Sequence, residues 1–262
     1  MPPTATDSER NGPALPTATR REVVARLASA QKSNRGAAGY SRWVNRRAGR
    51  HLAAIAYLAG LTPNQVSVIS AVFTFPAIAA IAVFEPTWIE AVAVTLALLI
   101  GYAFDSADGQ VARLRGGGSP AGEWLDHVLD ALKVSTLHLA IAVAWFRFYD
   151  LRHPALLLVP LGFAATSAVF FFALVLSDML RRIARLSAGG SSVTTASVDP
   201  DERAPVLRSL VVLPNDYGVL CLAVLLLSVQ PAFVTAYSVL LAANVVFLLV
   251  GCVRWFREMQ TL

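Results

Sequence analysis

Charged residues are scarce in this chain of 262 residues. They make up 15% of it, against about 25% of an ordinary soluble domain, while hydrophobic residues make up 56%. Cysteine is scarcer still, and its two examples, Cys221 and Cys252, lie in apolar stretches where a thiol usually behaves as a small buried hydrophobe. We therefore expect no disulfide framework. The shortage of charge argues against a soluble enzyme and indicates a membrane protein.

The N-terminal part lacks the pattern of a signal peptide. Residues 1–36 are rich in Pro, Ala, Thr, Ser and Arg and contain no apolar core before a small-residue cleavage site, so we expect a disordered cytosolic tail. The net charge of +5 does not indicate nucleic acid, because the basic residues flank apolar stretches instead of forming one patch interleaved with aromatics. Anionic lipid headgroups are the expected partner.

Long apolar runs fill most of the remaining chain. A bilayer core of about 30 Å requires about 20 mainly apolar residues per helix. Runs of this kind predict an all-α bundle of six transmembrane helices, which forms a catalytic domain over residues 62–258 with a cytosolic loop at about 178–214. The six predicted spans are 66–84, 89–104, 124–145, 154–176, 217–229 and 232–253.

Basic residues set the expected orientation, since Arg and Lys of short loops favour the cytosolic side. A cytosolic N-terminus leaves Arg147 and Arg152 outside, and six crossings return the C-terminus to the cytosol. Residues 37–61 combine several arginines with Trp43 and other apolar residues, which predicts an amphipathic helix in the cytosolic interface. A plain basic linker is the alternative. Pro63 then favours the start of the first span.

Acidic residues gather where the second predicted span ends and the third begins. They are Asp105, Asp108, Asp126 and Asp130. The first two are three positions apart and the last two are four apart, so each pair shares one face of a helix. The glycines at 116–118 break the first helix, and Ser119 followed by Pro120 starts the second. Carboxylates brought together across this turn require a cation, and their oxygens suit Mg²⁺, Mn²⁺ or Ca²⁺.

Small and basic residues lie between the acids. Gly109 and Ala112 leave a stripe without large side chains beside Asp108, and Gly122 does the same on the facing helix, so a ligand can approach the backbone. Arg113 can bind phosphate oxygens through its guanidinium. Taken singly, such residues more often mark ion paths or helix packing. Taken together with a metal, they indicate a site for a nucleotide diphosphate.

The whole pattern, D-x2-D-G-x2-A-R-x8-G-x3-D-x3-D from Asp105 to Asp130, resembles the motif of the CDP-alcohol phosphotransferases, also called CDP-alcohol phosphatidyltransferases. The resemblance implies that an acceptor hydroxyl attacks the phosphorus that carries the alcohol of a CDP-alcohol, and that CMP leaves. It implies a homodimer, a pair of divalent ions (Mg²⁺ or Mn²⁺), and Asp130 both as a fourth ligand and as the general base. The other implied ligands are Asp105, Asp108 and Asp126, and the implied cytidine and pyrophosphate pocket comprises Asp108, Gly109, Ala112, Arg113 and Gly122.

The substrate pair is left open by the motif. We expect CDP-diacylglycerol as donor and a polar, phosphorylated acceptor, because Lys133 lies near the acidic face and a basic cluster follows the fourth span: Arg181, Arg182 and Arg185. These arginines equally suit flanking charge on the cytosolic side. Residues 41–46 are instead similar to family members that join a soluble CDP-inositol to inositol phosphate. His127 and His138 are expected to pack rather than to bind metal.

A divalent cation transporter is the alternative from another class of protein. That function needs carboxylates near the middle of the membrane and a continuous polar path. The acids here fall at the cytosolic edge, and the later spans contain no Asp, Glu or Lys within the membrane. We therefore expect an enzyme of the cell membrane whose active site faces the cytosol.

Overall fold

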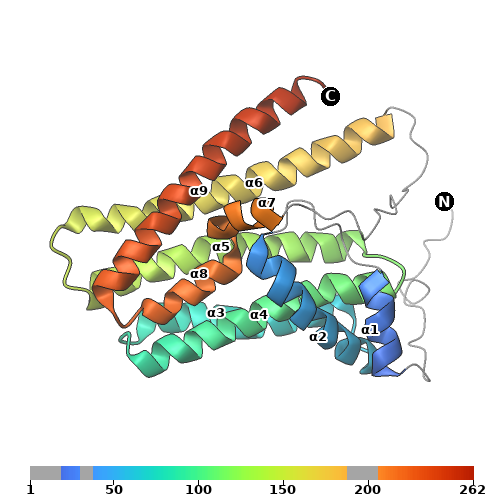
Figure 1. Cartoon of the computed structure of the whole chain (residues 1–262), viewed down its shortest axis with the longest axis horizontal. Coiled ribbons are helices and arrows are strands. Elements are labelled where there is room, and N and C mark those ends of the chain that lie inside the picture. Colours follow the sequence, from blue (N-terminus) through green and yellow to red (C-terminus); the bar gives the residue numbers. More distant parts are fainter. Residues whose placement is uncertain (1–18, 30–37, 188–205) are drawn as a thin grey trace.

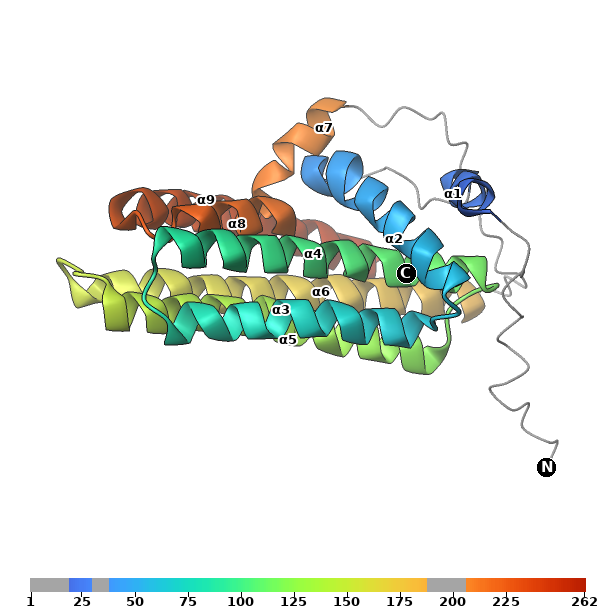
Figure 2. The ribbon, with the colours of Figure 1, turned by 90° about the horizontal axis from the view of Figure 1, so that it is seen from below.

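The computed structural model describes residues 19–29, 38–187 and 206–262, and every regular element within these ranges is helical. Within them, five helices are long and apolar enough to cross a membrane, and they lie roughly side by side (Figures 1 and 2). These are α3 (Pro63–Val83), α4 (Trp88–Leu114), α5 (Pro120–Phe148), α6 (Leu158–Ser187, preceded by the short turn η2, Pro154–Leu157) and α9 (Gln230–Met259). The all-α membrane bundle is confirmed.

Local signals fix the helix ends next to the acidic residues. Thr62 caps α3 in a reciprocal pair with Gln65, and Pro63 occupies the first turn. At the start of α5, the Ser119 hydroxyl accepts the Gly122 N–H at 3.1 Å, and Pro120 again follows the cap. Gly116 and Gly117 have φ values of 89° and 131° in the turn between α4 and α5, a region that glycine adopts readily. Both predicted helix starts are confirmed.

The predicted fifth span is shorter than the others. It consists of α8 (Tyr217–Ala223) and η4 (Val224–Leu226), an apolar helix below the length of a usual crossing. It begins where the Tyr217 ring lies 5.2 Å from Lys133 Nζ, and it ends where the Tyr149 hydroxyl donates to the Leu227 carbonyl. The segment therefore contacts Lys133 of α5 at its start and Tyr149, which follows α5, at its end, and it packs chiefly against α4.

The apolar core between α5, α6 and α9 encloses a polar network around His138. Its ring stacks on Phe163 at 4.0 Å between centroids, and its nitrogens lie 2.6 Å from the Tyr237 hydroxyl and 3.0 Å from Ser167 Oγ. A buried polar ring with partners on both nitrogens is a stable part of a core. The prediction that His138 packs rather than binds metal agrees with these contacts.

The segment before α3 forms the short helix η1 (Ser41–Asn45) and then α2 (Arg46–Leu58), which crosses obliquely over α4 (Figure 2). Gly49 makes the close approach possible, because a Cβ there would lie 2.8 Å from Ser106 Oγ, the residue after Asp105. α2 buries Gly49 and Ala53 and exposes Ile55 and Leu58. Its position in a membrane interface remains a prediction.

Residues 20–29 differ from the disordered tail that we predicted, because they form helix α1 (Arg20–Ser29). Thr19 and Glu22 cap its start reciprocally, with N–H to oxygen distances of 2.8 and 3.3 Å. Val23 and Leu27, one turn apart, are buried in the small core that α2 and α4 share. Residues 1–18 and 30–36 of the predicted tail lie outside the described residues.

The expected cytosolic loop at about 178–214 also begins too early. α6 continues to Ser187, supported by an ion pair between Asp178 and Arg182 at 2.9 Å, one turn apart. Residues 188–205 of this loop lie outside the described part of the chain, and 206–211 form the short helix α7 (Val206–Val211).

Gly101 provides a test of the packing that positions the acids. A Cβ at this position would lie 2.2 Å from Thr74 Oγ1 and 3.1 Å from the Ser70 carbonyl of α3. We expect Gly101→Ala to destabilise the protein by about 1–3 kcal/mol, measured as a lower melting temperature in detergent, because α3 must move away. The matched control is Gly162→Ala, whose Cβ would meet only Leu241 at 3.9 Å. An unchanged melting temperature for Gly101→Ala would contradict the close packing.

Candidate active site

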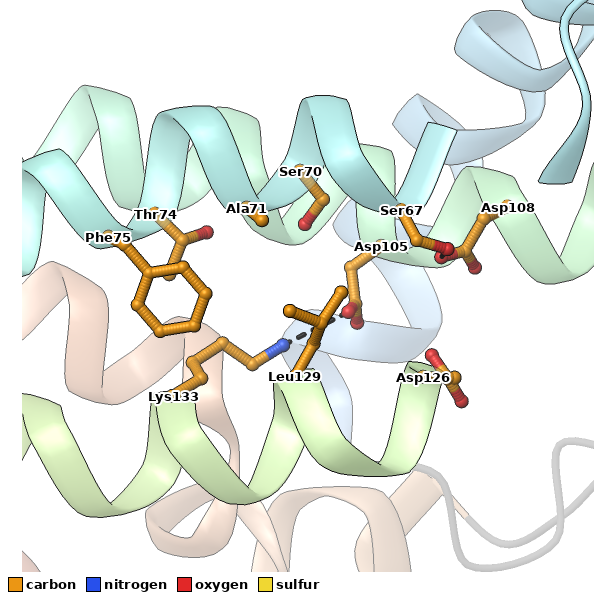
Figure 3. A pocket seen from close by; sticks show the side chains of 10 residues that line it. All are labelled: Ser67, Ser70, Ala71, Thr74, Phe75, Asp105, Asp108, Asp126, Leu129 and Lys133. Atoms are coloured by element: carbon orange, nitrogen blue, oxygen red, sulfur yellow. Dashed lines mark hydrogen bonds and ion pairs between the residues drawn. The ribbon is translucent and has the colours of Figure 1, made fainter. Parts of the chain in front are cut away.

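Three of the four predicted acids come together at one end of the bundle. Asp105 and Asp108 lie on α4 and Asp126 lies on α5, and each offers an oxygen within 4.8 Å of those of the other two (Figure 3). α4 and α5 are antiparallel and joined by the glycine turn, so the two acidic faces meet as expected. This group of three carboxylates is called the aspartate triad below.

The fourth acid, Asp130, is paired with a cation instead. The Lys133 ammonium lies 2.6 Å from Asp130 Oδ1 and 3.0 Å from Asp105 Oδ1, so it bridges an acid of the triad and the acid outside it. Lys133 is 7% exposed. In the described residues the grouping of potential metal ligands contains the triad without Asp130. Its predicted role as a fourth ligand therefore stays a prediction.

A serine on α3, which the sequence analysis missed, binds the most buried acid of the triad. Ser67 Oγ donates to Asp108 Oδ2 at 2.6 Å, and Asp108 is 6% exposed. Ser67 lies one turn after Pro63, where its side chain faces α4. Pro63 marks the start of α3 in the sequence and so places Ser67 in its first turns. That Ser67 binds Asp108 follows only from the packing of α3 against α4.

A cavity opens beside the triad between α3, α4 and α5 (Figure 3). Its walls change from polar at the acids to apolar further along α3. The lining residues are Ser67, Ser70, Ala71, Thr74, Phe75, Asp105, Asp108, Asp126, Leu129 and Lys133. The carboxylates and the Lys133 ammonium make its polar end suited to a small charged group.

Of the residues predicted for the nucleotide, Asp108 lines this cavity and the other four do not. A Cβ on Gly109 would meet only Arg113 Nη1 at 3.7 Å, so the α4 backbone is open to a ligand there. The Arg113 Nε is buried and has no hydrogen-bond partner within the described residues. Gly122 faces α3, where a Cβ would lie 3.0 Å from Asn64 Oδ1. Ala112 is partly buried.

The arginine cluster of α6 is tied to carboxylates. Arg181 binds Glu258 of α9 at 2.7 and 2.9 Å, and Arg182 binds Glu123 of α5 at 2.7 Å. Arg185 donates to the Arg181 carbonyl at 3.2 Å. These contacts hold α6 against α5 and α9, so the cluster does not form the unpaired cationic pocket that we considered for a phosphorylated acceptor.

His127 packs against Phe171, and its Nε2 lies 3.9 Å from Glu123 Oε1. These contacts agree with the expectation that His127 packs rather than binds metal.

Asp216 and Tyr217, which the sequence analysis also missed, lie at the start of α8, where the Tyr217 ring is 5.2 Å from Lys133 Nζ. Asp216 caps α8 and accepts the Ser41 N–H at 2.8 Å and the Gly218 N–H at 3.0 Å. Burial raises the pKa of Asp216, and the backbone N–H groups of Ser41 and Gly218 oppose that rise. Tyr217 packs edge-on to Tyr102 of α4 and lies beside Lys133. The N-terminal segment thus reaches the neighbourhood of the acids through α8.

The aspartate triad fits a hard divalent cation. Carboxylate oxygens within 4.8 Å of one another can share one ion, and no thiol or imidazole of the described residues joins this group. Ser67 and Lys133 orient two of the three acids from outside, as partners of metal ligands usually do. The orphaned Arg113 Nε beside the open Gly109 backbone fits an anion such as a diphosphate.

A helical membrane bundle with a triad of acids, a neighbouring basic group and a cavity is the arrangement expected of a membrane protein that binds a divalent cation together with an anion. Residues 60–253 match the CDP-alcohol phosphatidyltransferase family, and the chain belongs to this family. It is a CDP-alcohol phosphotransferase, an integral membrane transferase that acts on a CDP-alcohol and an alcohol acceptor. The recognised resemblance is confirmed over most of the chain.

Solved structures include one with the same overall fold. It is a phosphatidylinositol phosphate synthase from Mycobacterium tuberculosis in complex with manganese and citrate. The two chains are 21% identical, with a TM-score of 0.51, and the match covers 80% of this chain and 88% of that chain. No curated protein matches this chain.

Proposed function

We propose that this enzyme transfers the phosphatidyl group of CDP-diacylglycerol to a hydroxyl of a polar, phosphorylated alcohol, with release of CMP, in phospholipid synthesis. The observation that carries the proposal is the aspartate triad beside the Asp130–Lys133 pair, in a chain of this family. A neighbour of similar fold that makes phosphatidylinositol phosphate supports the choice of a lipid donor.

In this proposal the triad of Asp105, Asp108 and Asp126 would hold Mg²⁺ or Mn²⁺, in a pair of ions as the family resemblance implies. Bound metal would supply neutralisation of the diphosphate charge and stabilise the CMP leaving group. The fold neighbour, solved with manganese, supports this choice of ion. Asp130 takes the proton from the acceptor hydroxyl as it attacks phosphorus, which makes that oxygen a stronger nucleophile.

The cytidine and diphosphate would bind along α4 beside the triad. The orphaned Arg113 Nε would donate to a phosphate oxygen, and the open backbone at Gly109 leaves space for the nucleotide. Ala112 and Gly122 keep large side chains away from the same region. Such a site works by positioning and charge neutralisation, and it needs no nucleophilic side chain.

A soluble CDP-alcohol such as CDP-inositol, with an inositol-phosphate-like acceptor, is the second candidate donor. Its basis is the sequence similarity of residues 41–46. In the structure this segment is engaged with the C-terminal third of the chain, through Ser41 to Asp216 and through Arg42 to Ser209 at 3.1 Å. These contacts give the segment a structural role and reduce the weight of the similarity, so we favour the lipid donor.

The same proposal includes six crossings, with the segment of α8 and η4 as the fifth. Its support is that this apolar segment contacts Lys133 of α5 at its start and Tyr149, which follows α5, at its end. Six crossings keep both termini in the cytosol, with the triad at the cytosolic edge of the cell membrane and α2 in the interface. A homodimer, which the family resemblance implies, also remains a prediction.

The decisive experiment is a screen of the purified protein for CMP release. CDP-diacylglycerol and soluble CDP-alcohols are each paired with a panel of free and phosphorylated alcohols, with Mg²⁺, Mn²⁺ or EDTA present. We expect release that requires metal, CDP-diacylglycerol and a phosphorylated acceptor. Release from a soluble donor alone would select the alternative donor. Thermal stabilisation by Mn²⁺ but never by CDP or CMP, without CMP release, would favour the cation transporter.

A further inference from the structure

Helix α1 lies outside the part of the chain that matches the family, which begins at residue 60. It lies beside the second half of α2 (Figure 2). Val23 and Leu27 of α1 are fully buried, whereas Ala25 and Ala28 are exposed. A helix of ten residues is too short to be stable alone in water, so α1 depends on its buried contacts.

The core that α1 completes includes the catalytic stretch of α4. α1 packs on α2, and the two helices share this core with Ala107 and Val111 of α4. Ala107 directly precedes Asp108 of the triad. Successive side chains of a helix point about 100° apart, so Ala107 and Asp108 face different sides of α4. This stretch of α4 therefore carries the triad on one side and the core of α1 and α2 on another.

α2 contacts α4 at Gln110, which lies in the sequence between Gly109 and Arg113. Gln110 Nε2 donates to the Arg46 carbonyl of α2 at 3.4 Å, and a Cβ on Gly49 would lie 3.0 Å from the same nitrogen. Gln110 is 1% exposed, so α2 fits closely against this part of α4. A shift of α2 would therefore change the surroundings of the two residues proposed to bind the nucleotide.

We propose that Val23 and Leu27 are positioning residues, through which α1 holds α2 against α4 and maintains the shape of the nucleotide site. The inference rests on the proposed function, in which Gly109 and Arg113 line that site. Neither Val23 nor Leu27 lines the cavity or belongs to the triad. Release of α1 should therefore weaken nucleotide binding and leave the metal ligands and the chemical step in place.

The test is the double variant Val23→Asp, Leu27→Asp in the full-length purified protein, because two carboxylates are too costly to keep in an apolar core. Hydrogen exchange followed by mass spectrometry reports docking: the amides of α1 should lose protection, and those of α2 should exchange faster. We expect the dissociation constant for CMP and the donor KM to rise about tenfold, with kcat within about threefold of the wild-type value. Mn²⁺ affinity, measured by the EPR signal of free Mn²⁺, should also stay within about threefold.

The matched control is Ala25→Asp combined with Ala28→Asp, which adds the same two charges to exposed positions of α1. It should leave the exchange of α1 and the affinity for CMP at wild-type values. Val23→Ile combined with Leu27→Met keeps both buried positions apolar, so this variant should also behave like the wild type.

Several outcomes would overturn the inference. Undocking of α1 with unchanged CMP affinity would do so, and so would a rise in activity, which would make α1 an inhibitory element. Equal loss of CMP and Mn²⁺ binding would indicate general damage, and a protected α1 in the double variant would show that docking does not depend on Val23 and Leu27. Val23→Ala combined with Leu27→Ala carries the same test if the Asp variant does not fold. If the wild type releases no CMP from any substrate pair, the proposed function fails, whereas the exchange of α2 still decides whether α1 holds it in place.

Discussion

Asp108→Asn should reduce metal-dependent CMP release by at least about 10³-fold, the scale of losing a principal electrostatic group in an active site. Asp108 is buried, accepts a hydrogen bond from Ser67 at 2.6 Å and shares the triad with Asp105 and Asp126. Asn keeps the shape of the side chain and removes its charge, so the triad loses one of its anionic ligands. The measurement is CMP release at increasing Mn²⁺ together with Mn²⁺ affinity, and both should fall.

The matched control for this prediction is Asp150→Asn. It makes the same chemical change in the turn after α5, where the Asp150 backbone binds Gln230. Activity and Mn²⁺ affinity should stay at wild-type values. An Asp108→Asn enzyme that binds Mn²⁺ normally and releases CMP at the normal rate would remove Asp108 from the metal site.

Asp130→Asn should have an effect of similar size but of a different kind. At saturating Mn²⁺ we expect kcat to fall about 10³-fold, within the range that general-base catalysis contributes together with positioning. The dissociation constant for CMP should change by less than about threefold, because Asp130 lies outside the triad and pairs with Lys133. Isothermal titration with CMP and stopped-time assays of CMP release give the two values.

The comparison of the two variants tests the assignment of roles. Asp108→Asn should weaken Mn²⁺ binding, whereas Asp130→Asn at saturating Mn²⁺ should impair turnover while nucleotide binding persists. Substantial turnover by Asp130→Asn would rule out its role as the base. Equal loss of CMP binding in both variants would instead place Asp130 with the metal ligands.

Much of the fold could be predicted because its signals are local. The caps at Thr62 and Ser119, with a proline after each, mark where α3 and α5 begin. Apolar length identified five of the six predicted spans. The fifth predicted span is shorter in the structure than expected, because the composition of a segment shows how apolar it is but not how far its helix extends. Helix α1 was missed because two buried residues, Val23 and Leu27, are too few to stand out in a polar segment.

In the candidate site, too, the contacts within one helix or across one turn could be predicted, whereas those between separate helices could not. Three acids could be grouped from their spacing and from the glycine turn, which brings α4 and α5 together. The pairing of Asp130 with Lys133 is also local, three positions along one helix. The contacts of Ser67 with Asp108, and of Lys133 with Asp105, depend on how neighbouring helices are aligned. No pattern within one segment reports that alignment.

The hydrogen bond from Ser41 to Asp216 joins the segment before α2 to the cap of α8, residues that lie 175 positions apart. During translation the helices emerge in order from the N-terminus, and their early packing can begin before the chain is complete. The acids of α4 and α5 are then already inserted, but the ribosome has yet to deliver Tyr217 and its neighbours. We therefore expect the acids of α4 and α5 to meet before the last helices pack near them, so that the surroundings of the triad are completed late in synthesis.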